Sequence, residues 1–322
     1  MTPDPVLDLR GLSVDFRTRE GTVHALENVS LTVGAGEFVG VVGESGSGKS
    51  VMAFAVAGIL DRAGKVTAGR ALLGDKDLLA MDERQRRESR GRDIAVIFQS
   101  PRTSLNPIRP VGRQIEDVLR RRFGLDRAAA RQRALELLTQ VRITDPEKRL
   151  HAYPFSMSGG MCQRVLIALA LACQPKLMIA DEPTTGLDVT TQASIMDLLK
   201  DLARKQGMAV LFITHDLSLA AEACDRIVVM HAGHVVEEAP TSALFAQAHH
   251  PYTARLIAAV PARAQTLAQL SAIPGTLPDL RGVLPPCRYS GRCDRMLPTC
   301  HASPLKITQV QAHHRVACGN PL

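Results

Sequence analysis

The chain contains no tryptophan, and aromatic residues make up only 3% of its 322 residues. Proteins that bind single-stranded nucleic acid usually combine basic grooves with aromatic side chains that stack on bases, so we expect no nucleic-acid partner. No uninterrupted apolar run reaches the roughly 18 residues that a membrane-spanning helix needs. The opening segment, MTPDPVLDLRGLSVDF, carries acids where a secretory signal needs basic residues and an apolar block. The sequence therefore predicts a globular protein that is not exported.

Disulfide chemistry is also not expected. The cysteine count is seven, an odd number, and Cys162, Cys173 and Cys224 lie within apolar stretches. Secreted disulfide scaffolds are short and rich in regularly spaced cysteines. We expect a cytosolic protein whose thiols are reduced.

Composition changes near Val260. The segment 261–322 has seven basic and two acidic residues, and it holds 8 of the 19 prolines and 4 of the 7 cysteines. Most of the formal net charge of +7 therefore lies in this segment. We expect a main domain over 1–260 and an irregular, Cys/Pro-rich C-terminal extension over 261–322.

Within 1–260, short β-branched runs alternate with longer amphipathic stretches, which predicts an α/β domain with a mostly parallel sheet. The expected buried strands are Phe38–Val42, Ile94–Phe98, Leu177–Ala180, Val210–Thr214 and Ile227–Met230. Two helices are expected, over Gly112–Phe123 and Asp126–Val141. The interval 102–157 has few strand signals and is expected to be a helical insertion.

A glycine-rich loop follows the first of these strands and matches G-x-x-x-x-G-K-[ST]. Glycines let successive backbone N–H groups turn toward phosphate oxygens, and the following helix directs its positive end to the same anion. Lys49 is expected to reach the β- and γ-phosphates, and the Ser50 hydroxyl to bind Mg²⁺. The expected nucleotide-binding residues are Gly43, Glu44, Ser45, Gly46, Ser47, Gly48, Lys49 and Ser50.

Two carboxylates, Asp181 and Glu182, follow the buried strand that ends at Ala180. Beside a phosphate loop, Asp181 is expected to help hold the metal and Glu182 to polarise an attacking water. A second anion-binding helix start is expected at Ser158, Gly159 and Gly160. One chain has no need of two such helix ends, whereas a dimer that places nucleotide between two subunits does.

These motifs and their order resemble the ATP-binding subunits of ABC transporters over essentially the whole chain. The resemblance implies a P-loop NTPase fold in which an antiparallel N-terminal sheet accompanies the parallel core. It makes Gln99 the Q-loop glutamine, which contributes to catalysis and to Mg²⁺ binding, and His215 in ITHD the γ-phosphate sensor. MSGGM at 157–161 becomes the signature and Asp188 the D-loop aspartate. An aromatic residue usually stacks on adenine; Phe16 is the first candidate and Val23 the alternative.

Longer segments resemble the dipeptide, oligopeptide and nickel importer branch: IFQSPRTSLNP, ADEPTTGLDVTTQASIMDLL, HPYTARLIAAVP and IPGTLPDLRGVLPPC. This resemblance implies an ATPase at the cytoplasmic face of the inner membrane that energises uptake of a peptide-like solute. It implies a second, similar ATPase subunit in a heterodimer, two permeases and a periplasmic or lipid-anchored binding protein. Import of nickel or another non-peptide solute is the alternative. An exporter subunit is less favoured because it would not be expected to carry the extension, and a non-transport ABC ATPase because the chain has neither paired cassettes nor a long coiled-coil insertion.

Four cysteines in the extension, Cys287, Cys293, Cys300 and Cys318, have the spacing C-x5-C-x6-C-x17-C. A [4Fe–4S] cluster is favoured over zinc because zinc ribbons usually contain C-x2-C pairs, and unligated thiols are the third alternative. Three arginines close to them in sequence either offset the charge of such a cluster or are solvated. These are Arg288, Arg292 and Arg295.

Overall fold

The structure is a computed structural model that describes residues 4–260, 273–302, 305 and 307–322. Residues 261–272, with which the expected extension begins, lie outside the described residues. Contacts divide the chain into two compact units. Unit 1 comprises Met1–Gly34, Phe38–Met81 and Leu211–Leu322, and unit 2 comprises Ala35–Glu37 and Asp82–Val210. The division at residue 260 stays a prediction, because these units group residues by contact and not by composition.

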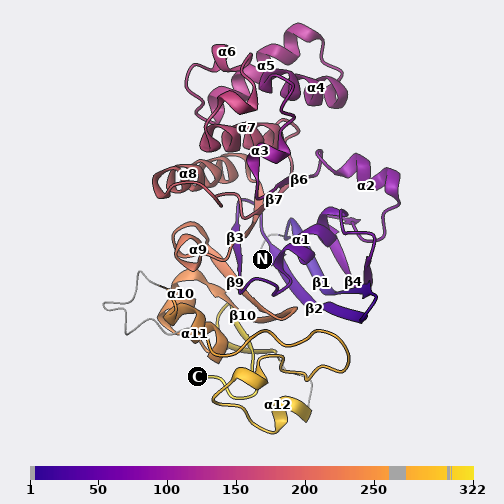
Figure 1. Cartoon of the computed structure of the whole chain (residues 1–322), viewed down its shortest axis with the longest axis vertical. Coiled ribbons are helices and arrows are strands. Elements are labelled where there is room, and N and C mark those ends of the chain that lie inside the picture. The colour runs from indigo at the N-terminus through magenta and orange to yellow at the C-terminus, as the bar shows by residue number, and fades with distance from the viewer. Residues whose placement is uncertain (1–3, 261–272, 303–304, 306) are drawn as a thin grey trace. The chain divides into compact units, whose positions relative to one another are not determined.

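Unit 1 begins with an antiparallel sheet whose strand order is β2-β1-β4-β5 (Figure 1). Its strands are β1 (Leu7–Thr18), β2 (Gly21–Val33), β4 (Gly64–Leu73) and β5 (Lys76–Asp77). In β1 the apolar side chains of Leu7, Leu9, Leu12 and Val14 are fully buried. The register between β1 and β2 shifts in the middle of the pairing, so the inward apolar positions do not follow one strict alternation.

The strands of the second sheet that lie wholly or partly in unit 1 follow the order β11-β12-β10-β9-β3-β8. These strands are β3 (Phe38–Val42), β8 (Ala209–Ile213), β9 (Arg226–His231), β10 (His234–Pro240), β11 (Ile307–Gln311) and β12 (His314–Ala317). All five residues of β3 are buried, as are those of β8. Strand β3 pairs in parallel with β9, and such fully apolar strands are typical of a covered parallel sheet.

The helices of unit 1 are short. They are α1 (Lys49–Ala57), α9 (Leu217–Ala223), α10 (Thr241–Ala246), α11 (Pro251–Ala258) and α12 (Thr299–Ala302). Gly58, the residue that follows α1, adopts the left-handed conformation; glycine is the residue that does so without a Cβ clash.

Unit 2 contains the parallel strand pair β6 (Ile94–Ile97) and β7 (Leu177–Asp181) together with most of the longer helices (Figure 1). These helices are α2 (Glu83–Ser89), α3 (Pro101–Ser104), α4 (Val111–Phe123), α5 (Arg127–Gln140), α6 (Pro146–Arg149), α7 (Gly159–Leu171) and α8 (Val189–Gln206). Helices α4, α5 and α7 contact one another, and their apolar faces form the core of this unit through residues such as Ile115 and Leu137.

The extension departs in one respect from the irregular segment expected from its composition. Strands β11 and β12 form a hairpin, and β12 pairs with β10 at Glu237 and Glu238. The side chains of His314 and Val316 are buried while Ile307 is exposed. The hairpin therefore adds two strands to the edge of a sheet, and composition alone did not indicate these strands.

Candidate nucleotide site

The phosphate loop connects β3 to α1 in unit 1 and spans Gly43 to Ser50. Gly43, Gly46 and Gly48 all have positive φ angles, of 152°, 82° and 99°. A Cβ on Gly43 would lie 2.1 Å from the carbonyl oxygen of Met230, and one on Gly48 would lie 2.7 Å from Leu26. Glycine is therefore required at both positions by conformation and by space.

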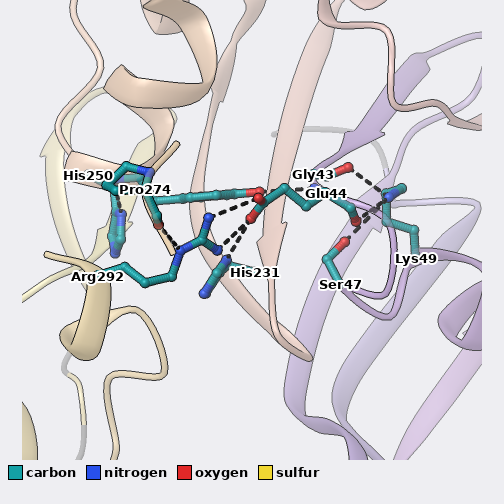
Figure 2. Close-up of polar contacts among 9 residues, drawn as sticks. Gly43, Glu44, Ser47, Lys49, His231, His250, Pro274 and Arg292 are labelled. Atoms are coloured by element: carbon teal, nitrogen blue, oxygen red, sulfur yellow. Dashed lines mark hydrogen bonds and ion pairs between the residues drawn. The ribbon is translucent and has the colours of Figure 1, made fainter. Parts of the chain in front are cut away.

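Lys49, the first residue of α1, is 6% exposed. Its ammonium group donates hydrogen bonds to the carbonyl oxygens of Gly43 (2.8 Å) and Glu44 (2.9 Å) and to the hydroxyl of Ser47 (3.4 Å) (Figure 2). A buried cation at the positive end of a helix is suited to a multiply charged anion. The loop and Lys49 thus have the conformation and the buried charge that the sequence predicts for a phosphate site, and phosphate binding by them stays a prediction.

His215 lies on an exposed turn of the same unit, directly after β8. The N–H of Thr214, its neighbour, donates to the carbonyl of Val41 in β3 (3.2 Å). This bond places the turn close to the strand that leads into the phosphate loop. Asp216 then caps α9 by accepting hydrogen bonds from the N–H groups of Ser218 and Leu219.

Phe16, the candidate for adenine stacking, is half-buried in β1 and pairs across the strands with Val23. A Cβ on Gly64 would lie 2.8 Å from the Phe16 ring, so the ring packs over this glycine at the start of β4. Which of the two residues stacks on adenine stays a prediction.

Unit 2 brings together two residues that are 83 positions apart. The side-chain amide of Gln99 donates a hydrogen bond to the carboxylate of Glu182 (2.8 Å), and the Thr185 hydroxyl donates to the same oxygen (3.1 Å). Glu182 has a φ of 47°, which is uncommon for a residue with a side chain. Asp181, at the end of β7, is 7% exposed. The family resemblance assigned Gln99 to catalysis and Mg²⁺ binding, and no feature of the sequence indicated the contact of Thr185 with Glu182.

The start of α7 lies next to the start of α8 within unit 2. Ser158 caps α7 by accepting a hydrogen bond from the Met161 N–H (3.3 Å), and Asp188 caps α8 by accepting from the Thr191 N–H (2.9 Å). A Cβ on Gly160 would lie 2.5 Å from the Thr191 side chain. The glycine therefore allows the signature segment and the D-loop segment to approach closely.

The four cysteines of the extension are near one another. The Cys287 N–H donates to the Cys300 carbonyl (3.2 Å). Burial, with smaller contributions from the other three thiols, raises the pKa of Cys287 to about 11. Within the described residues, however, no group of three or more His, Cys, Asp or Glu side chains is arranged to hold a metal ion.

Two of the three arginines near these cysteines are neither solvated nor directed at the thiols. Arg288 pairs with Glu27 and donates to the carbonyls of His24 (3.0 Å) and Ala232 (2.6 Å). Arg292 pairs with Glu44. Because these partners are far away in the sequence, no local signal indicated the pairings.

No helix among the described residues is long and apolar enough to cross a membrane. Residues 26–185 match the family model described as ABC transporter. Residues 236–300 match the model described as oligopeptide/dipeptide transporter, C-terminal region.

The similarity to known relatives extends along nearly the whole chain. A probable peptide ABC transporter ATP-binding protein of Sinorhizobium fredii is 46% identical over 98% of this chain and 95% of its own. A dipeptide transport ATP-binding protein of Escherichia coli is 44% identical over 98% of this chain and 97% of its own length. Among solved structures, a dimeric ATP-binding cassette in a post-hydrolysis state with ADP and Pi is 31% identical, with a TM-score of 0.65 over 73% of this chain and 98% of that one. The chain belongs to the ATPase family of ABC transporters, in the branch that carries the oligopeptide/dipeptide transporter C-terminal region.

Proposed function

We propose that the chain hydrolyses ATP to energise import of a di- or oligopeptide through separate permease subunits, at the cytoplasmic face of the inner membrane. The observation that carries the proposal is the agreement of two features. The chain has a phosphate loop with a buried lysine, and relatives at 42–46% identity over almost their full lengths are described as peptide or dipeptide transport proteins.

The solute can be tested with the complete transporter in proteoliposomes. ATP hydrolysis should rise when a peptide-loaded binding protein is added and should stay at its basal rate with the unloaded protein. Stimulation by a nickel-loaded binding protein, with none by peptide, would instead favour the non-peptide alternative.

Each proposed residue has a distinct role at this site. The loop N–H groups and Lys49 hold the phosphates, and His215 senses the γ-phosphate. Ser50, Asp181 and Gln99 are the proposed Mg²⁺ ligands, since hydroxyl, carboxylate and amide oxygens are the donors that this cation prefers. When bound, Mg²⁺ neutralises charge on the β- and γ-phosphates.

Glu182 is the proposed general base. Its carboxylate accepts a proton from a water molecule as the water oxygen forms a bond to the γ-phosphorus. The bond between that phosphorus and the bridging oxygen then breaks, and the products are ADP and phosphate. The Gln99 and Thr185 hydrogen bonds hold the carboxylate in one orientation.

We further propose that Ser158, Gly159, Gly160 and Asp188 act on the nucleotide of a second, similar ATPase subunit in a heterodimer. Support comes from the likeness to a dimeric cassette and from the exposed Ser158 at a helix start. Two permeases and a binding protein complete the proposed assembly, and we propose no nucleic-acid partner.

Substitution of Ser158 by arginine should leave ATP binding by this chain unchanged and prevent its ATP-dependent dimerisation. The bulky cation would occupy the helix start that is expected to meet the partner's nucleotide. Equilibrium binding and size-exclusion chromatography with ATP measure the two effects separately. Ser156→Arg, two residues earlier and also exposed, is the matched control. Loss of ATP binding by the variant monomer would contradict the role in trans.

For the extension, we propose that Cys287, Cys293, Cys300 and Cys318 hold a [4Fe–4S] cluster. The proposal is supported by the gathering of four cysteines in this extension, where the Cys287 N–H donates to the Cys300 carbonyl (3.2 Å), and cysteine thiolates are the usual ligands of such clusters. A cluster extends over several atoms, so its ligands need not surround a single ion. When bound, it supplies a fixed cross-link between segments of the extension.

Anaerobically purified protein should then be brown and contain about four irons per chain. Substitution of Cys293 by serine should remove the colour and leave ATP binding intact. Cys173→Ser, at a buried cysteine in unit 2, should keep the iron. Colourless protein with stoichiometric zinc would favour the zinc alternative, and protein without either metal would leave the thiols unligated.

A further inference from the structure

The C-terminal extension contacts the phosphate loop directly. The guanidinium of Arg292 donates two hydrogen bonds to the carboxylate of Glu44, of 2.8 and 2.9 Å, and a third to the carbonyl of Pro274 (2.7 Å) (Figure 2). The Arg292 side chain is only 6% exposed. A two-pronged pair of this kind fixes the orientation as well as the charge of the carboxylate.

A second contact holds the backbone of the same loop residue. The Tyr252 hydroxyl accepts a hydrogen bond from the Glu44 N–H (2.9 Å). Leu277, which like Arg292 belongs to the extension, packs on Gly46, where an added Cβ would lie 3.2 Å from the leucine. The extension therefore contacts two positions of the loop.

Glu44 connects these contacts to Lys49. Its carbonyl oxygen accepts one of the Lys49 hydrogen bonds, while its side chain and N–H are held by Arg292 and Tyr252. A displacement of Glu44 would thus move one of the acceptors that orient the Lys49 ammonium. The phosphate loop is held from the extension on one side and by its own lysine on the other.

The charge of Glu44 also matters, because ATP brings several negative charges to this loop. The Arg292 hydrogen bonds hold the pKa of Glu44 below its ordinary value, so the carboxylate is ionised at neutral pH. His231 lies 3.7 Å from it, but burial lowers the pKa of His231 to about 4. The histidine is therefore neutral at pH 7. The positive charge that the extension places against the Glu44 carboxylate is that of Arg292.

We propose that Arg292 is a positioning residue for ATP binding, which orients Glu44 and neutralises its carboxylate so that the loop can accept a triphosphate. The extension would then be a working part of the nucleotide site and not an appendage. This inference rests on the proposed assignment of the phosphate loop.

The test measures ATP affinity of the full-length chain by titration calorimetry. Substitution of Arg292 by alanine should weaken binding about tenfold, the effect expected when a charge-assisted pair is lost near the ligand. Adding Glu44→Gln to this variant should recover most of the affinity, because the uncompensated carboxylate is then removed. A role limited to packing of the extension would not give this recovery.

Arg281→Ala is the matched control. Arg281 is also an extension arginine, but its ion pairs are with Glu20 and Asp279, outside the phosphate loop. It should bind ATP as the wild type does. The proposal is overturned if Arg281→Ala weakens binding as much as Arg292→Ala, if Arg292→Ala has no effect, or if Glu44→Gln fails to restore the affinity of Arg292→Ala. Failure of the wild-type chain to bind ATP would instead reject the nucleotide-site assignment.

Discussion

Substitution of Glu182 by glutamine should lower the rate of ATP hydrolysis by about 100-fold or more while ATP binding is retained. The amide keeps the shape of the side chain but cannot accept the proton of the attacking water. Nucleotide that binds and is not hydrolysed should accumulate and stabilise a dimer of ATPase subunits. Phosphate release by the assembled transporter, with the site of the paired subunit inactivated in parallel, measures the effect.

The matched control for this experiment is Glu136→Gln. Glu136 is an exposed glutamate of α5 in the same unit, paired with Arg133, and its substitution should leave turnover unchanged. If Glu182→Gln retains turnover within about tenfold of wild type, Glu182 is not the principal base.

Substitution of Lys49 by alanine should raise the dissociation constant for ATP by roughly 100-fold, the equivalent of about 3 kcal/mol. The ammonium group is buried and directed into the loop that is proposed to hold the phosphates. Its loss leaves the negative charge of the nucleotide with less compensation than the site requires. Calorimetric titration of the full-length chain gives the constant directly.

Because Lys49 also bonds to Gly43, Glu44 and Ser47, its removal could loosen the loop in the absence of ligand. Thermal unfolding without nucleotide measures that contribution separately. Lys65→Ala, at an exposed lysine of β4, is the control for loss of a charge. An unchanged dissociation constant for Lys49→Ala would remove Lys49 from the phosphate site.

The elements that the sequence predicted most closely have strong local signals. Strand β3 has the predicted bounds because an apolar run ends on a glycine-rich loop. Asp126 caps α5, so a polar residue marks the start of that helix. Strand β6 ends at Ile97, one residue before the prediction, and Phe98 is 41% exposed, which shows that apolar character alone does not set a strand end. The N-terminal antiparallel sheet was expected only from family resemblance, since its register shifts blur the alternation.

In the candidate site, too, some features could be predicted from the sequence and others could not. The phosphate loop could be read from sequence because its chemistry resides in eight adjacent residues. The link between Glu44 and Arg292 could not, because 248 positions separate the two residues. Neither residue type signals such a partner by itself, since both glutamate and arginine are ordinarily solvated. Tyr252 was part of a motif used to assign the branch, but no feature of that motif indicated a hydrogen bond to the loop.

The separation of Glu44 and Arg292 in the sequence also determines when their contact can form during synthesis of the chain. At ribosomal rates of about 5–20 residues per second, roughly 12 to 50 s pass between translation of the loop and translation of its arginine. Strands β1 and β2 pair locally and can form early, whereas Arg292 is added near the end of translation. A nascent chain therefore gains the contact between Arg292 and Glu44 only when the extension has emerged, and a chain that terminates before residue 292 carries Glu44 without its compensating charge.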